Sequence, residues 1–183
     1  TAHGTGNGTS TQFVTTNGGA SNVNFGVNVP ADYGQSNPDL VTPLYTNGDT
    51  NSTAPTGALV KFAYNSTGTS PTPTTLATKA QVGSTWGVAY ARSTKTLYAA
   101  AFLKRHVGLG PNGLGAIYAV NINGGTPTLF ADLAALGANV GTVLSNSARG
   151  LGAPTSPNND ATTYAQVGKV GLGDIDISDD ERT

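Results

Sequence analysis

The chain has 183 residues and a mass of 18.4 kDa, enough for one domain with a buried core. Only 10% of the residues are charged, and nine Lys or Arg against ten Asp or Glu give a net charge of −1. This balance excludes broad electrostatic binding to nucleic acid or to anionic membranes, which needs a dense basic surface. The chain has no cysteine, which excludes disulfides and thiolate chemistry. No apolar run is long enough to predict insertion into a membrane.

The first 22 residues are rich in Gly, Thr, Asn and Ser and predict a flexible arm. Residues 23–183 are expected to form one β domain. Its first strand signal is the strict alternation of apolar residues through 23–29, which is typical of a half-buried strand. Turn signals such as Asn47-Gly48 follow, and short strands are expected at 40–41 and 44–45 between them.

Further strands are predicted at 57–65, 87–91 and 115–123, and in the Thr126–Leu133 segment. Paired prolines in 66–75 forbid a helix there and predict a turn or polyproline-like connection. The segment 96–107 is ambiguous: its composition favours a helix, whereas its place after a short turn favours a hairpin strand. The best helix candidate is short, at 129–138. The long stretch 134–172 predicts an elaborated loop or small extra strands.

Internal repeats are the most informative feature of the sequence. The tetrapeptide Ala-Gln-Val-Gly at 80–83 recurs at 165–168. Each copy precedes an alternating segment, Gly-Val-Ala-Tyr-Ala at 87–91 and Gly-Asp-Ile-Asp-Ile at 173–177, and then a polar turn that ends in a basic residue and Thr. A second pair joins 57–65 to 115–123. Four short strands per unit, in tandem, predict antiparallel blade-like repeats that stack on one another.

The segments GVAYARSTKTLYAAAF (87–102) and GDIDISDDERT (173–183) resemble the strand-and-turn signature of YVTN/NHL-like β-propeller blades. The longer stretch 80–122 resembles the propeller-like region of large secreted bacterial surface proteins that also carry SdrD-type B repeats. The resemblance covers roughly residues 23–183 and implies an all-β, partial β-propeller that is extracellular or on the cell surface. The second signature stops at Thr183, so the blade series is expected to be incomplete.

An incomplete blade leaves an open strand edge, and an open edge is a template for β-strand addition. The expected partners are therefore other protein chains or the remainder of a longer polypeptide. Glycans are a further expected partner if Trp86 and nearby tyrosines serve as a platform for stacking sugars.

Half of the acidic residues lie close to the C-terminus. Alternation places Asp174 and Asp176 on one face, and Asp179 and Asp180 follow in the adjoining turn. Carboxylates this close repel one another unless a cation or hydrogen bonds compensate them, and Ca²⁺ prefers such oxygen ligands. These four residues are the candidate metal site, with Ca²⁺ as the candidate cofactor. The alternative is a solvated strand end followed by an Asp-rich turn.

Three other features suggest binding or modification. Trp86 precedes an expected strand, where it is either a core anchor, the favoured role, or a platform for stacking sugars. Asn7, Asn51 and Asn65 begin N-glycosylation sequons. Gly108, Gly110 and Gly113 match the spacing of a dinucleotide fingerprint, but a β-like segment follows where that site needs a helix, which favours a plain hairpin loop.

No constellation of catalytic residues stands out, and no catalytic residue is assigned. The first functional hypothesis is a non-enzymatic structural or adhesive module of a bacterial surface protein, filament or surface layer. The second is a cation-dependent propeller lyase or hydrolase that uses Asp174 and Asp176. The third is a carbohydrate-binding module built around Trp86 and nearby tyrosines.

Overall fold

The computed structural model describes residues 17–19, 21, 37–51, 56–68 and 72–181. The chain divides into two units, Thr1–Pro38 and Asp39–Thr183. Most of the first unit, including the strand expected at 23–29, lies outside the described residues. The arm at 1–22 and its boundary with the β domain therefore stay predictions.

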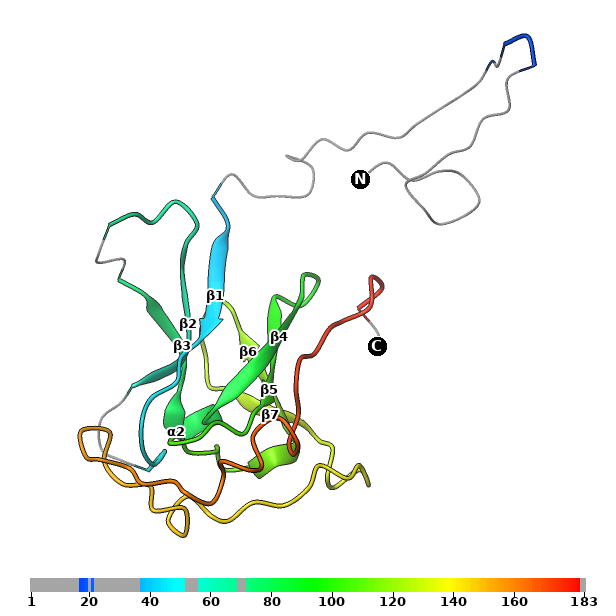
Figure 1. The fold of residues 1–183 in the computed structure, drawn as a ribbon. Helices are drawn as coiled ribbons and strands as arrows, with labels where there is room; N and C mark the ends of the chain where they lie inside the picture. Colours follow the sequence, from blue (N-terminus) through cyan, green and yellow to red (C-terminus); the bar gives the residue numbers. More distant parts are fainter. Residues whose placement is uncertain (1–16, 20, 22–36, 52–55, 69–71, 182–183) are drawn as a thin grey trace. The chain divides into compact units, whose positions relative to one another are not determined.

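The second unit contains two antiparallel sheets in which strand order follows chain order (Figure 1). The three-stranded sheet comprises β1 (Asp39–Pro43), β2 (Gly57–Ala63) and β3 (Thr74–Thr78). The four-stranded sheet comprises β4 (Thr85–Ala91), β5 (Thr96–Ala101), β6 (Ala116–Asn121) and β7 (Thr128–Asp132). A single helical turn, α2 (Lys79–Val82), links the sheets, and a 3-10 turn, η1 (Gly113–Gly115), precedes β6.

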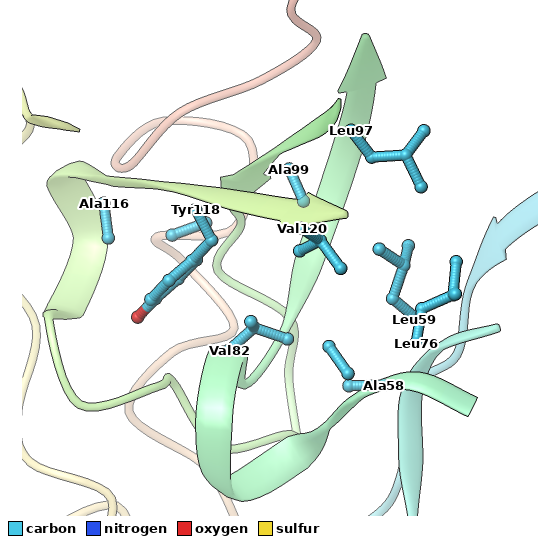
Figure 2. Close-up of a cluster of buried hydrophobic side chains, with 11 residues drawn as sticks. Ala58, Leu59, Leu76, Val82, Leu97, Ala99, Ala116, Tyr118 and Val120 are labelled. Atoms are coloured by element: carbon cyan, nitrogen blue, oxygen red, sulfur yellow. The ribbon is translucent and has the colours of Figure 1, made fainter. Parts of the chain in front are cut away.

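The hydrophobic core lies between the two sheets, so the unit is a β-sandwich-like module (Figure 2). Alternate residues of β5 and β6 meet apolar residues of β2 and β3, because side chains along a strand point to opposite faces in turn. Val82 of α2 joins the same cluster and is fully buried. The buried members are Ala58, Leu59, Leu76, Ala77, Val82, Leu97, Ala99, Ala101, Ala116, Tyr118 and Val120.

Most strand predictions are confirmed. The strands expected at 57–65, 87–91, 115–123 and in 126–133 are β2, β4, β6 and β7. The ambiguous segment 96–107 begins with β5 and has no helix, because Thr96–Ala101 pairs with strands on both sides. The repeated pair 57–65 and 115–123 forms the inner strands β2 and β6.

Other expectations differ from the structure. The helix considered at 129–138 is β7 followed by turns, since pairing with β6 outweighs the helical propensity of its Leu and Ala residues. The pair 44–45 is not a strand, and 173–177 is extended but unpaired. The all-β, antiparallel class is confirmed and one sheet has four strands, but no closed propeller is present in the described part of the chain.

Both copies of Ala-Gln-Val-Gly lie in helical turns with their glycine at positive φ, Gly83 at 64° and Gly168 at 75°. Gly83 ends its turn, whereas the second run of turns continues past Gly168 to Lys169. The first copy leads into β4, whereas the second leads into irregular extended chain. The expectation that the two copies are equivalent positions of successive blades is therefore wrong. Similar sequence gives a similar local turn, but only the first copy is followed by a segment with strand partners.

Candidate functional site

An exposed aromatic cluster lies where loops from both sheets meet. Trp86 of β4 stacks with Tyr45, which follows β1, at 6.5 Å between ring centroids. Its other neighbour is Phe102, just after β5, at 5.5 Å and a tilt of 38°. The Lys104 ammonium lies over the Tyr45 ring, 4.9 Å from the centroid, which is the geometry of a cation–π contact. We call Tyr45, Trp86, Phe102 and Lys104 the aromatic cluster. Its members are far apart in the sequence, and only the fold brings them together.

Trp86 is 53% exposed, so its favoured assignment as a core anchor is wrong. The reason is the alternation of β4: Thr85, Gly87, Ala89 and Ala91 are buried, and Trp86 points the other way. The alternative of a binding platform is left as an open hypothesis.

The C-terminal segment 173–181 runs beside β4 (red in Figure 1). A Cβ on Gly87 would lie 2.5 Å from the Ile175 backbone nitrogen, so only glycine allows this approach. At the far end, the Glu181 carboxylate accepts hydrogen bonds from the backbone N–H groups of Arg92 and Ser93 and from the Ser93 hydroxyl. These bonds, led by the hydroxyl, hold the pKa of Glu181 below its usual value.

A groove of about 310 Å³ lies between this segment and the face of the four-stranded sheet that points away from the core. Ile175 and Ile177 contribute to its lining, together with Tyr98, Ile117 and Phe130. The alternation expected for 174–177 is thus visible as burial: both isoleucines are half-buried and both aspartates are exposed. The segment lies along the sheet without pairing with it.

The predicted calcium site gains no support from the geometry. Asp174 and Asp176 each accept a hydrogen bond from the next backbone N–H, and Asp180 accepts one from the Ser178 hydroxyl. Within the ranges that the structure describes, no three acidic or histidine side chains gather as ion ligands. The site at Asp174, Asp176, Asp179 and Asp180, and Ca²⁺ itself, stay predictions.

The glycine-rich loop 108–113 packs against α2 and leads into the three-residue 3-10 turn η1, which begins at Gly113, and not into an α-helix. A Cβ on Gly110 would lie 2.5 Å from the Val82 carbonyl oxygen, and one on Gly83 would overlap the Gly110 backbone nitrogen. β6 follows η1 directly, as the hairpin reading predicted. Gly108 and Gly110 thus serve close backbone packing, whereas Gly113 adopts a positive φ in open space. The dinucleotide pattern lacks the α-helix N-terminus on which a phosphate would bind.

A second hollow, of about 460 Å³, lies between this loop, Asp132 and residues 140–146. Asp132 Oδ1 accepts hydrogen bonds from the Ala134 and Ala135 N–H groups, at 3.0 and 3.4 Å. The carboxylate therefore serves to turn the chain after β7. The hydroxyl residues Thr142 and Ser145 also line the hollow, but no His, Lys, Arg or second acidic side chain lies among its lining residues to activate them.

A buried ion pair that the sequence analysis missed holds the long loop. Arg149 and Asp160 are both fully buried, with Nη2 and Oδ2 2.7 Å apart. The same nitrogen donates to the carbonyls of Lys104 and Val107, and the His106 N–H donates to Asp160. Burial alone would raise the pKa of Asp160, but hydrogen bonds led by Arg149 outweigh it and lower that pKa. The contact between Arg149 and Lys104 joins residues that are 45 positions apart in the sequence, and no local sequence pattern predicts such a contact.

The predicted glycosylation sites are only partly visible. Asn7 lies outside the described residues, whereas Asn51 and Asn65 are exposed in turns. Exposure is what sugar attachment requires, and modification at these positions stays a prediction. In the described ranges, no helix has the length and apolar character needed to cross a bilayer.

Comparison with known proteins gives one informative similarity. The chain is 38% identical over 96 residues to Colossin-A of Dictyostelium discoideum, a large repetitive protein. The match covers 51% of this chain but 1% of Colossin-A. No protein family model matches the chain, and no solved structure matches it. The comparisons therefore support a β-rich module related to part of a large repetitive protein, and identify neither a propeller family nor a bacterial one.

Proposed function

We propose that this chain is a non-enzymatic structural or adhesive module of a large extracellular surface protein, joined to its neighbours through an open sheet edge. The observation that carries the proposal is the exposed edge strand β7. Among the described strands, β7 pairs only with β6, so one side of its backbone has no ladder partner. An unpaired strand edge accepts a further strand by main-chain hydrogen bonding.

The side chains of β7 favour association. Leu129 is 44% exposed and Phe130 61%, two consecutive large apolar residues on the outermost strand. Natural edge strands are usually protected by lysine, proline or a bulge. β7 has no lysine, but Pro127 directly precedes it and its ladder with β6 has a register shift at Phe130, so its edge is protected only in part. The only charged residue of β7, Asp132, has one carboxylate oxygen engaged by Ala134 and Ala135. A strand placed beside β7 would cover apolar surface without burying a free charge.

The distant similarity to Colossin-A supports a place within a larger protein. A segment that corresponds to 1% of a large repetitive protein is one module among many. Such modules act by linking and displaying surfaces, and their neighbours are the natural source of an added strand. The low charge of the chain suits a surface rich in hydroxyls and amides.

The test is the association state of the purified chain over a range of concentrations, by light scattering after size exclusion. We expect concentration-dependent dimers, and Phe130→Lys should weaken them by roughly tenfold or more, because it places a charge on the added-strand face. Leu136→Lys is the matched control, since Leu136 is 75% exposed but lies in a turn after β7. A chain that stays monomeric, or equal weakening by both variants, would contradict edge association.

The extracellular placement needs its own measurement. Antibodies raised against the chain should label intact, unpermeabilised cells of the source organism. Labelling that requires permeabilisation would contradict the surface assignment while leaving the association result intact.

A further inference from the structure

The aromatic cluster leaves an unusual amount of apolar ring surface in water. Trp86 contacts two other rings and still has 53% of its surface exposed. Tyr45 and Phe102, which follow β1 and β5, are half-buried and pack against the indole. Rings fixed by their neighbours lose little conformational freedom when a ligand binds, which is why tryptophan and tyrosine predominate at binding surfaces.

A positive charge accompanies these rings. Lys104 lies over Tyr45, and the ion pairs within the described ranges, Lys61–Asp39 and Arg149–Asp160, do not use it. The neighbouring Arg105 is engaged differently: its Nε donates to the Asp160 carbonyl, and its guanidinium lies over Tyr164. Among the described residues Lys104 thus has no carboxylate partner, and it contacts Tyr45, the ring on which the exposed indole of Trp86 stacks.

This pairing favours one ligand chemistry. The C–H face of a pyranose ring is apolar and packs on an indole, while a ring carboxylate can meet an ammonium group. Single-stranded nucleic acid also stacks on aromatic rings, but it needs a positive groove along its backbone. The chain has a net charge of −1, and the cation that lies over a ring of the cluster is Lys104.

We infer that the aromatic cluster is a binding site for acidic sugar residues, such as the uronates of a polysaccharide. Trp86 stacks on the sugar ring, Lys104 pairs with its carboxylate, and Tyr45 and Phe102 position the indole. The site is separate from the β7 edge, so this inference goes beyond the proposed function and does not depend on it.

The chain supplies its own probe, because Trp86 is its single tryptophan. Indole fluorescence therefore reports on this site alone. We expect oligogalacturonate to shift or quench the emission in a saturable way, with an affinity at least about tenfold above that for neutral dextran oligosaccharide. Unchanged emission at saturating oligogalacturonate would overturn the inference, and equal binding of dextran would overturn the assignment of an acidic ligand.

Variants assign the roles, with binding measured by calorimetry so that no tryptophan is needed. Trp86→Ala should lower the affinity for oligogalacturonate by roughly tenfold or more, and Lys104→Met should remove the preference over dextran. Tyr64→Ala is the matched control, since Tyr64 is 66% exposed in the turn after β2 and should leave binding unchanged. Wild-type affinity in Trp86→Ala would overturn the inference.

Two further outcomes are informative. An oligothymidylate that binds more tightly than oligogalacturonate would overturn the sugar assignment in favour of nucleic acid. Phe130→Lys should bind oligogalacturonate normally even where it disrupts association, so a failure of sugar binding and a failure of edge association are distinguishable.

Discussion

The two copies of Ala-Gln-Val-Gly adopt the same kind of turn in opposite surroundings. In the first copy, Val82 is fully buried in the core between the sheets. In the second, Val167 is half-buried against a smaller cluster formed by Leu103, Leu109 and Leu114. The space around the glycine of each copy differs as well: Gly83 contacts the 108–113 loop, whereas nothing lies within 4 Å of a Cβ on Gly168.

The difference shows how far a short repeat determines structure. The tetrapeptide favours a turn in both places, because its glycine adopts a positive φ at little steric cost. Whether a strand follows depends on partners: β4 pairs with β5 over Thr85–Ala91, while 173–181 lies along the face of the same sheet and pairs with no described strand. Apolar packing holds the first copy, and the nearby Arg149–Asp160 pair anchors the loop that carries the second.

The largest difference in stability between the two copies is expected when the glycine of each, Gly83 or Gly168, is replaced by alanine. Gly83→Ala adds a left-handed penalty and a clash with the Gly110 backbone, and should lower the free energy of unfolding by about 4 kcal/mol. Gly168→Ala carries only the conformational penalty, about 1 kcal/mol. Denaturant unfolding monitored by circular dichroism measures both. Equal losses would show that contacts around the turn are irrelevant.

Breaking the buried ion pair should loosen the loop that holds the second copy. Arg149→Met leaves the Asp160 carboxylate buried without its partner, which should cost about 3 kcal/mol. The double variant Arg149→Met with Asp160→Leu removes both charges and should recover most of that loss. Urea titrations of the two variants test this, and a double variant no more stable than the single one would contradict the account.

The valines of the two copies offer a smaller contrast. Val82→Ala should cost about 2 kcal/mol, because it leaves a space in a core that cannot close around it. Val167→Ala should cost less than about 1 kcal/mol, since that side chain is only half-buried. Thermal melting of the two variants provides the measurement. A larger loss of stability in Val167→Ala than in Val82→Ala would contradict the conclusion that Val82 is the more tightly packed of the two valines.

The smallest effect concerns the attachment of the segment that follows the second copy. Hydrogen bonds lower the pKa of Glu181 in the folded protein. The stabilisation that Glu181 gives to the attachment of this segment is therefore complete when the pH is above 4.5, the usual pKa of glutamate, and is lost as the pH falls through the lower pKa of the folded state. Acidification should therefore shift the methyl resonances of Ile175 and Ile177 toward solvent-exposed values. Glu181→Gln should weaken the attachment at neutral pH, with Asp179→Asn as the control. Resonances insensitive to both changes would exclude this clamp.

Much of the sheet structure was predictable because it follows local periodicity. Alternation and turn residues predict β2, β4, β6 and β7, and a glycine fingerprint that no α-helix follows predicts the hairpin loop that the structure shows. Trp86 was misplaced because alternation gives two faces without saying which one is covered. Trp86 lies on the edge strand β4, and none of the described strands covers its ring.

The features that sequence analysis missed all depend on distant contacts. Arg149 and Asp160 sit in a weakly patterned loop, and neither has a neighbour that marks it as buried. Asn146 likewise joins Leu109 to Asp49 through its amide. Lys104 gained significance only when folding placed it over Tyr45. These contacts depend on how loops from distant parts of the chain pack together, and such packing leaves no periodic pattern in the sequence.

The connection through α2 has a consequence for how copies of this module behave when concentrated. In the described part of the chain, residues 79–84 alone carry the backbone from one sheet to the other. If that hinge straightened, β4–β7 of one molecule could close onto β1–β3 of a second, forming an intertwined dimer with native interfaces. Refolding at high concentration should trap such dimers, and Gly83→Ala, which penalises the closed hinge, should enrich them.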